Sequence, residues 1–204
     1  ISTISNWKND LKTPAQAAAG AKGERDRIFA HCYGLYDAHM KACNVLDFDD
    51  LILLPTLLLQ RNEEVRERWQ NKIRYLLVDE YQDTNFAQHS IVLQLTQEHQ
   101  RVCVVGDDAQ SIYSFRGANI DNILKFTQLY KGAKLFKLEQ NYRSTQTIVC
   151  AANSLIEKNS EQIKKEVFSE KAKGEPIGVF NAYSDVEELS LIHISEPTRP
   201  EPIS

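Results

Sequence analysis

The sequence predicts an α/β protein whose mostly parallel β-sheet is flanked by helices. Two short apolar runs, at residues 74–79 and 101–105, each end abruptly in carboxylates, as a buried strand does when it delivers acids to its exposed end. A helical pattern separates the two runs, and strand and helix patterns continue to alternate beyond them, which favours parallel order. The acidic ends of neighbouring parallel strands form an edge of the kind that handles nucleoside triphosphates.

The composition is that of a globular protein, because 42% of the residues are hydrophobic and 25% are charged. A length of 204 residues allows one domain or parts of two. The net charge of -4 argues against non-specific coating of a polyanion, but it leaves room for a local nucleic-acid groove. No apolar run approaches the roughly 18 residues that span a bilayer, so no membrane partner is expected. The four cysteines are widely spaced and indicate reduced thiols in a cytosolic protein.

The first 43 residues predict a loop followed by a helix. Residues 1–22 are polar and alanine-rich and read as a loop, whereas residues 24–43 show helical periodicity and predict a packed core stripe. The stripe consists of Ile28, Cys32, Leu35, Tyr36, His39, Met40 and Cys43. Cys32, His39 and Cys43 share one helical face, but three candidate ligands without a fourth favour packing over a metal site.

Two more helices are expected before the first strand. Asp47 is placed to cap a helix that starts at Phe48, and Pro55 is expected to kink or break that helix. A helix over residues 62–72 carries a charged face, which is typical of a solvated surface.

Beyond the first strand, residues 85–98 predict a helix, and residues 120–130 predict another that stops at Gly132 as a left-handed cap. The inner side of the first of these helices is expected to carry Ile91, Val92 and Leu95. Residues 135–138 and 176–180 predict two further strands. Residues 145–158 predict a helix between them, with Ile148, Ala151, Ala152 and Leu155 facing inward.

Asp79 and Glu80 follow the first strand and suit a magnesium nucleotide. A carboxylate at this place can hold Mg²⁺ directly or through water, because hard cations prefer oxygen ligands. A neighbouring glutamate can orient or deprotonate an attacking water molecule. A surface acid pair that merely ends a strand is the alternative for the two residues alone.

Longer segments around this pair resemble the UvrD/PcrA/Rep group of superfamily-one DNA helicases. Residues 79–85 look like the second helicase motif of that group, residues 106–118 like the third and residues 138–144 like the fourth. Residues 46–51 match a further family segment. Order and spacing agree over essentially residues 1–188, and within the group the likeness to the Rep branch is greatest.

The resemblance implies a role for each matching residue of the nucleotide site. Asp79 would bind Mg²⁺, Glu80 would activate water, and Gln110 would contact the γ-phosphate of ATP and report it to the DNA groove. Tyr142 would lie against the adenine, and Arg143 would reach the γ-phosphate, where a guanidinium neutralises developing charge. An exposed turn residue is the alternative for Gln110, and a buried arginine–carboxylate pair is the alternative for Arg143.

The same resemblance implies a DNA-binding role for three residues. Tyr113 and Phe115 would stack on unpaired bases, each contributing about 1–3 kcal/mol, and Arg116 would face the DNA or pair with a nearby acid. A place in the core is the alternative for the two aromatic residues. Two positions depart from the family pattern: Ala109 replaces an aspartate, which reduces the charge at the strand end, and Phe115 replaces the commoner tryptophan, which weakens the grip on DNA.

For the whole protein the resemblance implies an ATP-dependent 3′-to-5′ DNA helicase of the bacterial cytoplasm. ATP and Mg²⁺ would be its cofactors, and single-stranded DNA and junctions with a 3′ single strand would be its substrates. Replication or repair proteins would be its partners. A helicase–nuclease subunit, a non-catalytic DNA-binding remnant and a magnesium-dependent phosphotransfer domain are the alternatives.

One motif that such a motor needs is missing from the sequence. None of the eight glycines is followed by lysine, so the phosphate-binding Gly-x-x-x-x-Gly-Lys-Ser/Thr loop is absent. The chain therefore reads as an internal fragment that is inactive alone. Its expected parts are the end of an accessory helical 1B-like domain (residues 1–44), a first RecA-like motor domain of the P-loop NTPase class (residues 45–137) and the start of a second (residues 138–188).

The last 16 residues, 189–204, are expected to be a non-native tail. Residues 189–199 break the helical pattern that residues 185–188 begin, and they resemble the conceptual translation of a sequencing adapter. The native polypeptide is therefore expected to stop near Glu188.

Overall fold

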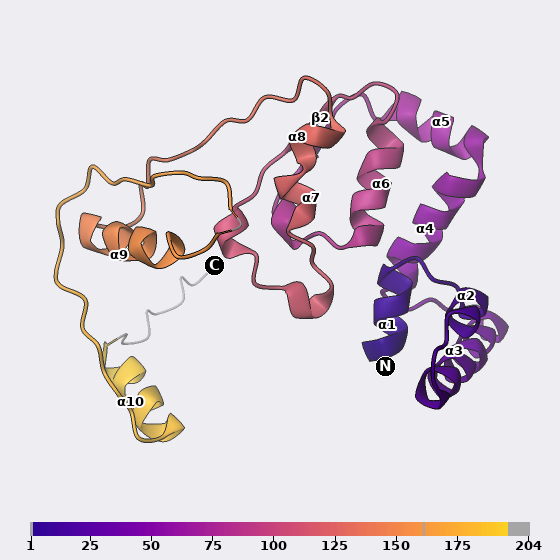
Figure 1. Ribbon diagram of the computed structural model, residues 1–204, viewed down its shortest axis with the longest axis horizontal. Coiled ribbons are helices and arrows are strands. Elements are labelled where there is room, and N and C mark those ends of the chain that lie inside the picture. Colours follow the sequence, from indigo (N-terminus) through magenta and orange to yellow (C-terminus); the bar gives the residue numbers. More distant parts are fainter. Residues whose placement is uncertain (1, 161, 196–204) are drawn as a thin grey trace, which may run out of the picture. The chain divides into compact units, whose positions relative to one another are not determined.

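The computed structural model describes residues 2–160 and 162–195. The chain forms two compact units (Figure 1). The first unit extends to Lys137 and includes Asn159–Lys164, and the second holds Leu138–Lys158 and the residues from Lys165 onward. No helix in the described part of the chain has both the length and the apolar character that crossing a bilayer requires.

The first unit begins with three helices, α1 (Ser2–Asn9), α2 (Pro14–Ala19) and α3 (Glu24–Ala42). The loop predicted for residues 1–22 is therefore wrong. A capping box explains α2, because the Thr13 hydroxyl accepts the Gln16 N–H while the Gln16 side chain accepts the Thr13 N–H. Pro14 occupies the first helical position, where its missing N–H is harmless.

The buried face of α3 is not the predicted one. Ala30 and Tyr33 are 3% and 1% exposed, and Tyr33 stacks on Trp7 of α1 with ring centroids 6.1 Å apart. In contrast, Ile28 and Leu35 are 56% and 60% exposed. Three further members of the predicted stripe are exposed as well: Cys32, His39 and Cys43. Apolar residues occur on both sides of α3, so periodicity alone did not identify the side that α1 and α2 cover.

Two helices lead to the sheet, α4 (Asp50–Arg61) and α5 (Glu63–Lys72). The helix begins two residues later than predicted, but Asp47 Oδ1 still accepts the Asp50 N–H at 2.8 Å. Pro55 does not break α4, which continues to Arg61. The helix predicted for residues 62–72 is confirmed.

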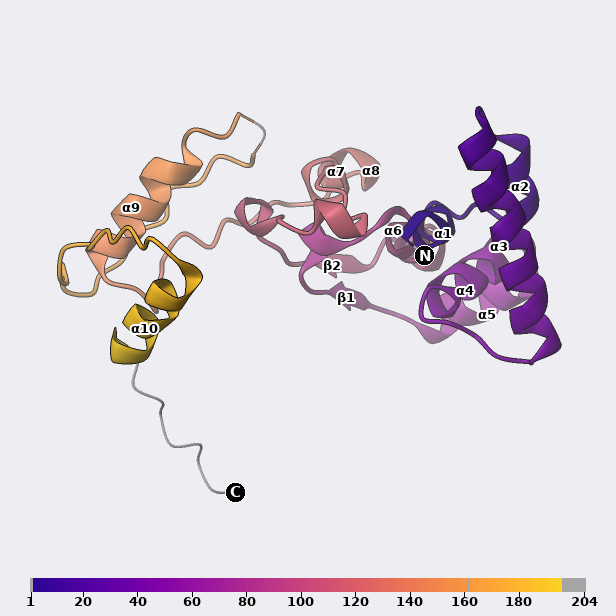
Figure 2. The same cartoon turned by 90° about the horizontal axis from the view of Figure 1, so that it is seen from below.

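A parallel two-stranded sheet forms the centre of the first unit. Strand β1 (Leu76–Val78) pairs with β2 (Val102–Val104), and α6 (Phe86–Thr96) connects them (Figure 2). This parallel pair confirms the predicted order of the two strands and the helix between them. The larger sheet is not present, because residues 135–138 and 176–180 form no strand.

Short helices and buried aromatic rings pack beside α6 and the segment that follows β1. The single helix predicted over residues 120–130 is instead two helices, α7 (Asp121–Leu124) and α8 (Phe126–Leu129). Tyr130 is 5% exposed, and its hydroxyl lies 2.6 Å from Thr96 Oγ1 of α6. Gly132 has the predicted left-handed conformation, with φ +85°.

The described residues of the second unit form two helices, α9 (Gln146–Ile156) and α10 (Asp185–Ser195), and an isolated parallel bridge between Gln140 and Phe168. The predicted inner face of α9 is wrong, because Val149 is its buried residue. The predicted inner residues Ile148, Ala151, Ala152 and Leu155 are exposed. Helix α10 also continues past Leu189, where the sequence pattern predicted that it would break off. Residues 185–196 contain no proline, and the next one is Pro197, so nothing in residues 189–195 excludes a helix.

Candidate functional site

Backbone pairing carries the two acidic segments together beyond the ends of the strands. The Val105 N–H donates to Val78 O at 2.8 Å, and the Tyr81 N–H donates to Val105 O at 3.0 Å. Asp79 and Glu80 therefore lie beside the segment that starts at Gly106, as expected for the carboxyl ends of adjacent parallel strands.

Glu80 has an unusual backbone conformation. Its φ and ψ are +50° and +41°, the left-handed region, which costs a residue with a Cβ about 1–2 kcal/mol. Asp79 Oδ1 accepts the Glu80 N–H at 2.9 Å, and both residues are exposed at the end of β1. Strain held at such a place is a common feature of functional sites.

Gln82, which the sequence did not single out, lies at the centre of the site. It belongs to a short 3-10 helix, Tyr81–Asp83, and is 1% exposed. Its Nε2 donates to Glu80 Oε2 at 2.8 Å, and its Oε1 accepts the Asp107 N–H at 3.0 Å. Within residues 79–85 the sequence pattern indicates a role for the acids, whereas a glutamine after a strand looks like an ordinary turn residue.

Gln110 is bound to the same group of residues. It ends a 3-10 helix, Asp108–Gln110, and its Nε2 donates to Asp107 Oδ2 at 2.8 Å. Hydrogen bonds therefore run from Glu80 through Gln82 and Asp107 to Gln110. Glu80 and Gln110 were predicted to meet, and the structure brings them into this one network.

Asp108 has a different environment from Asp107. It is 7% exposed, and its Oδ2 accepts the Ile163 N–H at 2.6 Å within the first unit. Ala109 follows it where the family pattern has a third acid, and its N–H donates to Asp107 Oδ1. The charge that this segment offers at the surface therefore comes mainly from Asp107.

Tyr113 and Phe115 form an exposed aromatic pair after this segment. They are 41% and 73% exposed, their ring centroids lie 5.9 Å apart, and the rings are tilted by 40°. A place in the core is thereby excluded for Phe115. Phe115 lies in the 3-10 helix Ser114–Arg116, which follows Tyr113 and ends at Gly117, with φ +85°. The side chain of Arg116 lies outside the described part of the structure.

Tyr142 and Arg143 lie in the second unit and are both exposed. The Tyr142 hydroxyl donates to Gln140 Oε1 at 2.7 Å, and Asn141 Oδ1 accepts the Arg143 N–H at 2.9 Å. Lys171 Nζ donates to Arg143 O at 2.9 Å. Arg143 is therefore held by its backbone, and its exposure excludes the alternative of a buried arginine–carboxylate pair.

A buried aromatic layer supports the acid pair from within. Tyr81 is fully buried, its hydroxyl lies 2.6 Å from His89 Nδ1, and its ring meets Phe126 edge to face. Burial raises the pKa of Tyr81 and lowers the pKa of His89, so both side chains are neutral near pH 7. The buried side chains beneath the candidate site therefore carry no charge.

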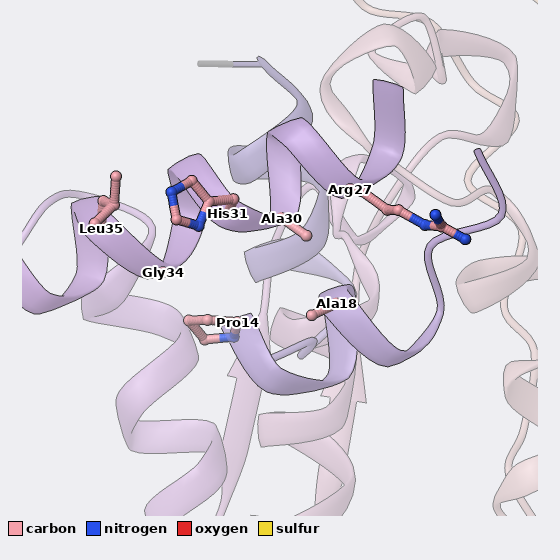
Figure 3. Close-up of a pocket in the computed structure, with 7 residues that line it drawn as sticks. All are labelled: Pro14, Ala18, Arg27, Ala30, His31, Gly34 and Leu35. Atoms are coloured by element: carbon pink, nitrogen blue, oxygen red, sulfur yellow. The ribbon is translucent and has the colours of Figure 1, made fainter. Parts of the chain in front are cut away.

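The donor set fits a magnesium nucleotide better than a closed metal cage. The described residues contain no group of three or more side chains arranged to hold a metal ion. Mg²⁺ commonly takes only one or two carboxylates and completes its shell with water and phosphate oxygens, which suits the exposed Asp79. A hollow of about 420 Å³ lies apart from these residues, between α2 and α3 (Figure 3).

Two family models match the chain. The model of the UvrD/REP helicase N-terminal domain matches residues 1–131, and that of the UvrD-like helicase C-terminal domain matches residues 136–195. The chain is 67% identical over 192 residues to the ATP-dependent DNA helicase Rep of Salmonella typhimurium and 65% identical to that of Escherichia coli. Each match covers 94% of this chain and 28% of the relative. Identity to the ATP-dependent DNA helicase PcrA of Staphylococcus aureus is 45%, over 94% of this chain and 26% of that relative.

Proposed function

This chain belongs to the UvrD/Rep helicase family, and from that premise we propose that it is part of an ATP-dependent DNA helicase that moves 3′ to 5′ on single-stranded DNA. The hydrogen-bonded path from Glu80 through Gln82 and Asp107 to Gln110 carries the proposal. It joins a candidate general base to a candidate phosphate sensor, as coupling of ATP hydrolysis to movement requires.

In this proposal Asp79 holds Mg²⁺, which neutralises charge on the phosphates when it is bound. Glu80 accepts a proton from the water molecule that attacks the γ-phosphate. Gln110 is neutral and exposed, so it can hydrogen-bond a phosphate oxygen without competing for the metal. Tyr142 stacks on the adenine, and Arg143 provides a guanidinium for the γ-phosphate.

The DNA-binding part of the proposal rests on the exposed pair Tyr113 and Phe115. Base–aromatic stacking tolerates any sequence, which suits a motor that moves along DNA. Arg116 would add a cation beside the pair. Only a few residues separate Gln110 from Tyr113, so a shift of the sensor can reach the stacked rings.

The domain assignment is also proposed. Residues 1–44 form the end of a 1B-like helical domain, residues 45–137 part of a RecA-like motor domain and residues 138–188 the start of a second. Residues 189–204 form the non-native tail, of which 196–204 lie outside the described residues. We also propose replication or repair proteins as its partners and DNA junctions with a 3′ single strand as its substrates. Its proposed location is the bacterial cytoplasm.

A chimera tests the activity. In it, residues 1–188 of this chain replace the corresponding part of the matched segment of the Salmonella typhimurium helicase Rep. We expect ATP hydrolysis stimulated by single-stranded DNA, and a loss of about 100-fold or more in the Glu80→Gln variant, because the proton acceptor is removed. Glu64→Gln, on the exposed face of α5, is the matched control and should hydrolyse ATP normally. Full activity of the Glu80→Gln chimera would refute the proposed role of Glu80.

The isolated chain should behave differently from the chimera. Without a Gly-Lys-Ser/Thr sequence it should neither bind ATP tightly nor unwind DNA. Measurable ATP turnover by the purified chain that disappears in Glu80→Gln would contradict this expectation. The exposed aromatic pair favours weak DNA binding as a second, non-catalytic function of the isolated chain, which fluorescence anisotropy with an oligothymidylate would detect.

A further inference from the structure

We propose that Gln82 is a positioning residue that sets the carboxylate of Glu80 and links it to residues 107–111. The inference rests on the proposed function, because it assigns a task to Gln82 within the same site. Gln82 itself touches neither nucleotide nor DNA in this proposal.

The Gln82 amide has one orientation that satisfies its surroundings. Its oxygen faces the Asp107 N–H at 3.0 Å, and its nitrogen faces Glu80 Oε2 at 2.8 Å and Asp83 Oδ2 at 3.3 Å. A flipped amide would oppose two donors on one side and turn its oxygen toward two carboxylates on the other. With 1% of its surface exposed, the amide has almost no contact with water that could replace these bonds.

This arrangement leaves Glu80 half engaged. One carboxylate oxygen, Oε2, accepts the bond from Gln82, and the exposed side chain keeps Oε1 for a water molecule or a ligand. A glutamate side chain on the surface normally samples several rotamers. The bond from a buried amide restricts that freedom and fixes which oxygen is presented.

Gly106 makes room for the Gln82 amide. A Cβ at position 106 would lie 2.5 Å from Gln82 Oε1 and 2.9 Å from Ile123 Cδ1, both closer than real Cβ contacts allow. Its backbone lies outside the left-handed region, so glycine is needed here for space. The end of β2 can therefore approach the acid segment closely only because residue 106 has no side chain.

Gln82 also contacts the segment that leads to the aromatic pair. Its backbone oxygen accepts the Ser111 hydroxyl at 3.4 Å, in addition to the bond between its side chain and Asp107. Two attachments to residues 107–111 mean that a displacement of this segment moves Gln82, and with it the Glu80 carboxylate. DNA bound at Tyr113 would then alter the placement of the general base.

Substitutions in the chimera described above test the inference. In Gln82→Met we expect kcat to fall about 10- to 100-fold while KM for ATP stays within about twofold, because a misplaced base slows chemistry more than binding. The stimulation of ATPase activity by single-stranded DNA should also fall. In Gln82→Glu a new carboxylate beside Glu80 should move the acid limb of the pH–rate profile upward by about one unit, because neighbouring carboxylates retain a proton to higher pH.

A matched control and an indirect variant separate positioning from folding. Gln70→Met removes another buried glutamine, whose Nε2 donates to Gln94 O at 2.7 Å, and should lower Tm without changing the pH profile. Gly106→Ala keeps the Gln82 side chain but adds a methyl group that would collide with its amide oxygen. It should therefore lower kcat and the stimulation by DNA as Gln82→Met does.

Asp83 Oδ1 is buried without a hydrogen-bond partner among the described residues, and Asp83 Oδ2 accepts a bond from Gln82. Because Gln82→Met removes that bond, it should also destabilise the fold. If that variant unfolds, Gln82→Glu and Gly106→Ala decide the question. The inference is overturned if both retain the pH profile, kcat and DNA stimulation of the unsubstituted chimera. An unsubstituted chimera without ATPase activity, or one that is indifferent to Glu80→Gln, removes the proposed function and the inference with it.

Discussion

Lys8 and Gln82 are both almost completely buried, and both hold carboxylates, but they do so in opposite ways. The Lys8 ammonium lies 2.7 Å from Asp47 Oδ2 and 2.7 Å from Asp50 Oδ1. The neutral amide of Gln82 instead binds Glu80 and leaves that carboxylate exposed. The first arrangement neutralises buried charge and joins α1 to the start of α4, whereas the second keeps negative charge at the surface, where a cation or a proton can reach it.

The pKa values of the first group agree with a structural role. Burial lowers the pKa of Lys8, but the hydrogen bonds that it donates to Asp47 and Asp50 and the charges of these carboxylates together outweigh it, so the pKa is raised. Burial raises the pKa of Asp47, but the hydrogen bonds from Lys8, the Asp50 backbone and Tyr36, together with the charge of Lys8, outweigh it, so that pKa is lowered. The stabilisation is therefore present at neutral pH, is lost as the pH falls through the folded pKa of Asp47, and is lost again as the pH rises through that of Lys8.

The largest effect is expected from Lys8→Met, which would leave two carboxylates without their cation. The free energy of unfolding should fall by about 3–5 kcal/mol, as when one partner of a buried ion pair is removed. Urea denaturation of the purified chain measures it. A loss below about 1 kcal/mol would show that Asp47 and Asp50 find water or other donors, and the contrast with Gln82 would disappear.

Removal of the aromatic pair should have the reverse signature, a loss of binding with little loss of stability. Phe115→Ala should weaken binding of single-stranded DNA by about 1–3 kcal/mol, and Phe115→Trp should strengthen it, because stacking follows the area of the ring. Tyr183→Ala is the control, since Tyr183 is 98% exposed in the second unit. Fluorescence anisotropy of the chimera with an oligothymidylate measures both; equal affinities for all three variants would contradict the DNA-binding role.

His89 should link stability to pH from beneath the functional site. Burial lowers its pKa from 6.5, so the stabilisation is complete above that value and decreases as the pH falls from it toward the folded pKa. The slope in this window should reach at most about 1.4 kcal/mol per pH unit, the value for one proton. Thermal unfolding between pH 7.5 and 5 should show a smaller slope for His89→Gln than for the exposed control His31→Gln. Identical slopes would argue that His89 is protonated without penalty.

The smallest effect is expected from Lys41, whose ammonium lies 2.7 Å from Asp37 Oδ2, the same distance as in the Lys8 pairs. Its side chain is 74% exposed, so Lys41→Met should lower the free energy of unfolding by at most about 0.5 kcal/mol. Comparison of Lys41→Met with Lys8→Met shows how burial changes the contribution of an ion pair to stability when the distance between the charges is the same. A loss as large as that of Lys8→Met would mean that burial does not set the difference.

Much of the geometry of the candidate site could be predicted from the sequence, because its signals are local. The acids follow the apolar runs that form β1 and β2, and the parallel pairing of these strands places Glu80 and Gln110 in one network. Gln82 was missed because its importance depends on the close approach of Gly106, which is a tertiary contact.

The faces of the helices were harder to predict. On α3 and α9 apolar residues lie on several sides, and the buried side depends on which helix or loop packs there. Tyr33 is buried because Trp7 and the short helix α2 cover it, and that helix was itself overlooked. Its capping box, Thr13 with Gln16 after a proline start, was a sequence signal that could have revealed it.

The left-handed backbone at Glu80 has a consequence for how variation at this position would be selected. Glycine or asparagine would adopt φ +50° with less strain, but neither offers a proton acceptor at the end of a long side chain. A library of residue-80 variants enriched for thermal tolerance should therefore drift away from glutamate. The same library enriched for turnover should return to it, so the two selections would diverge at this one codon.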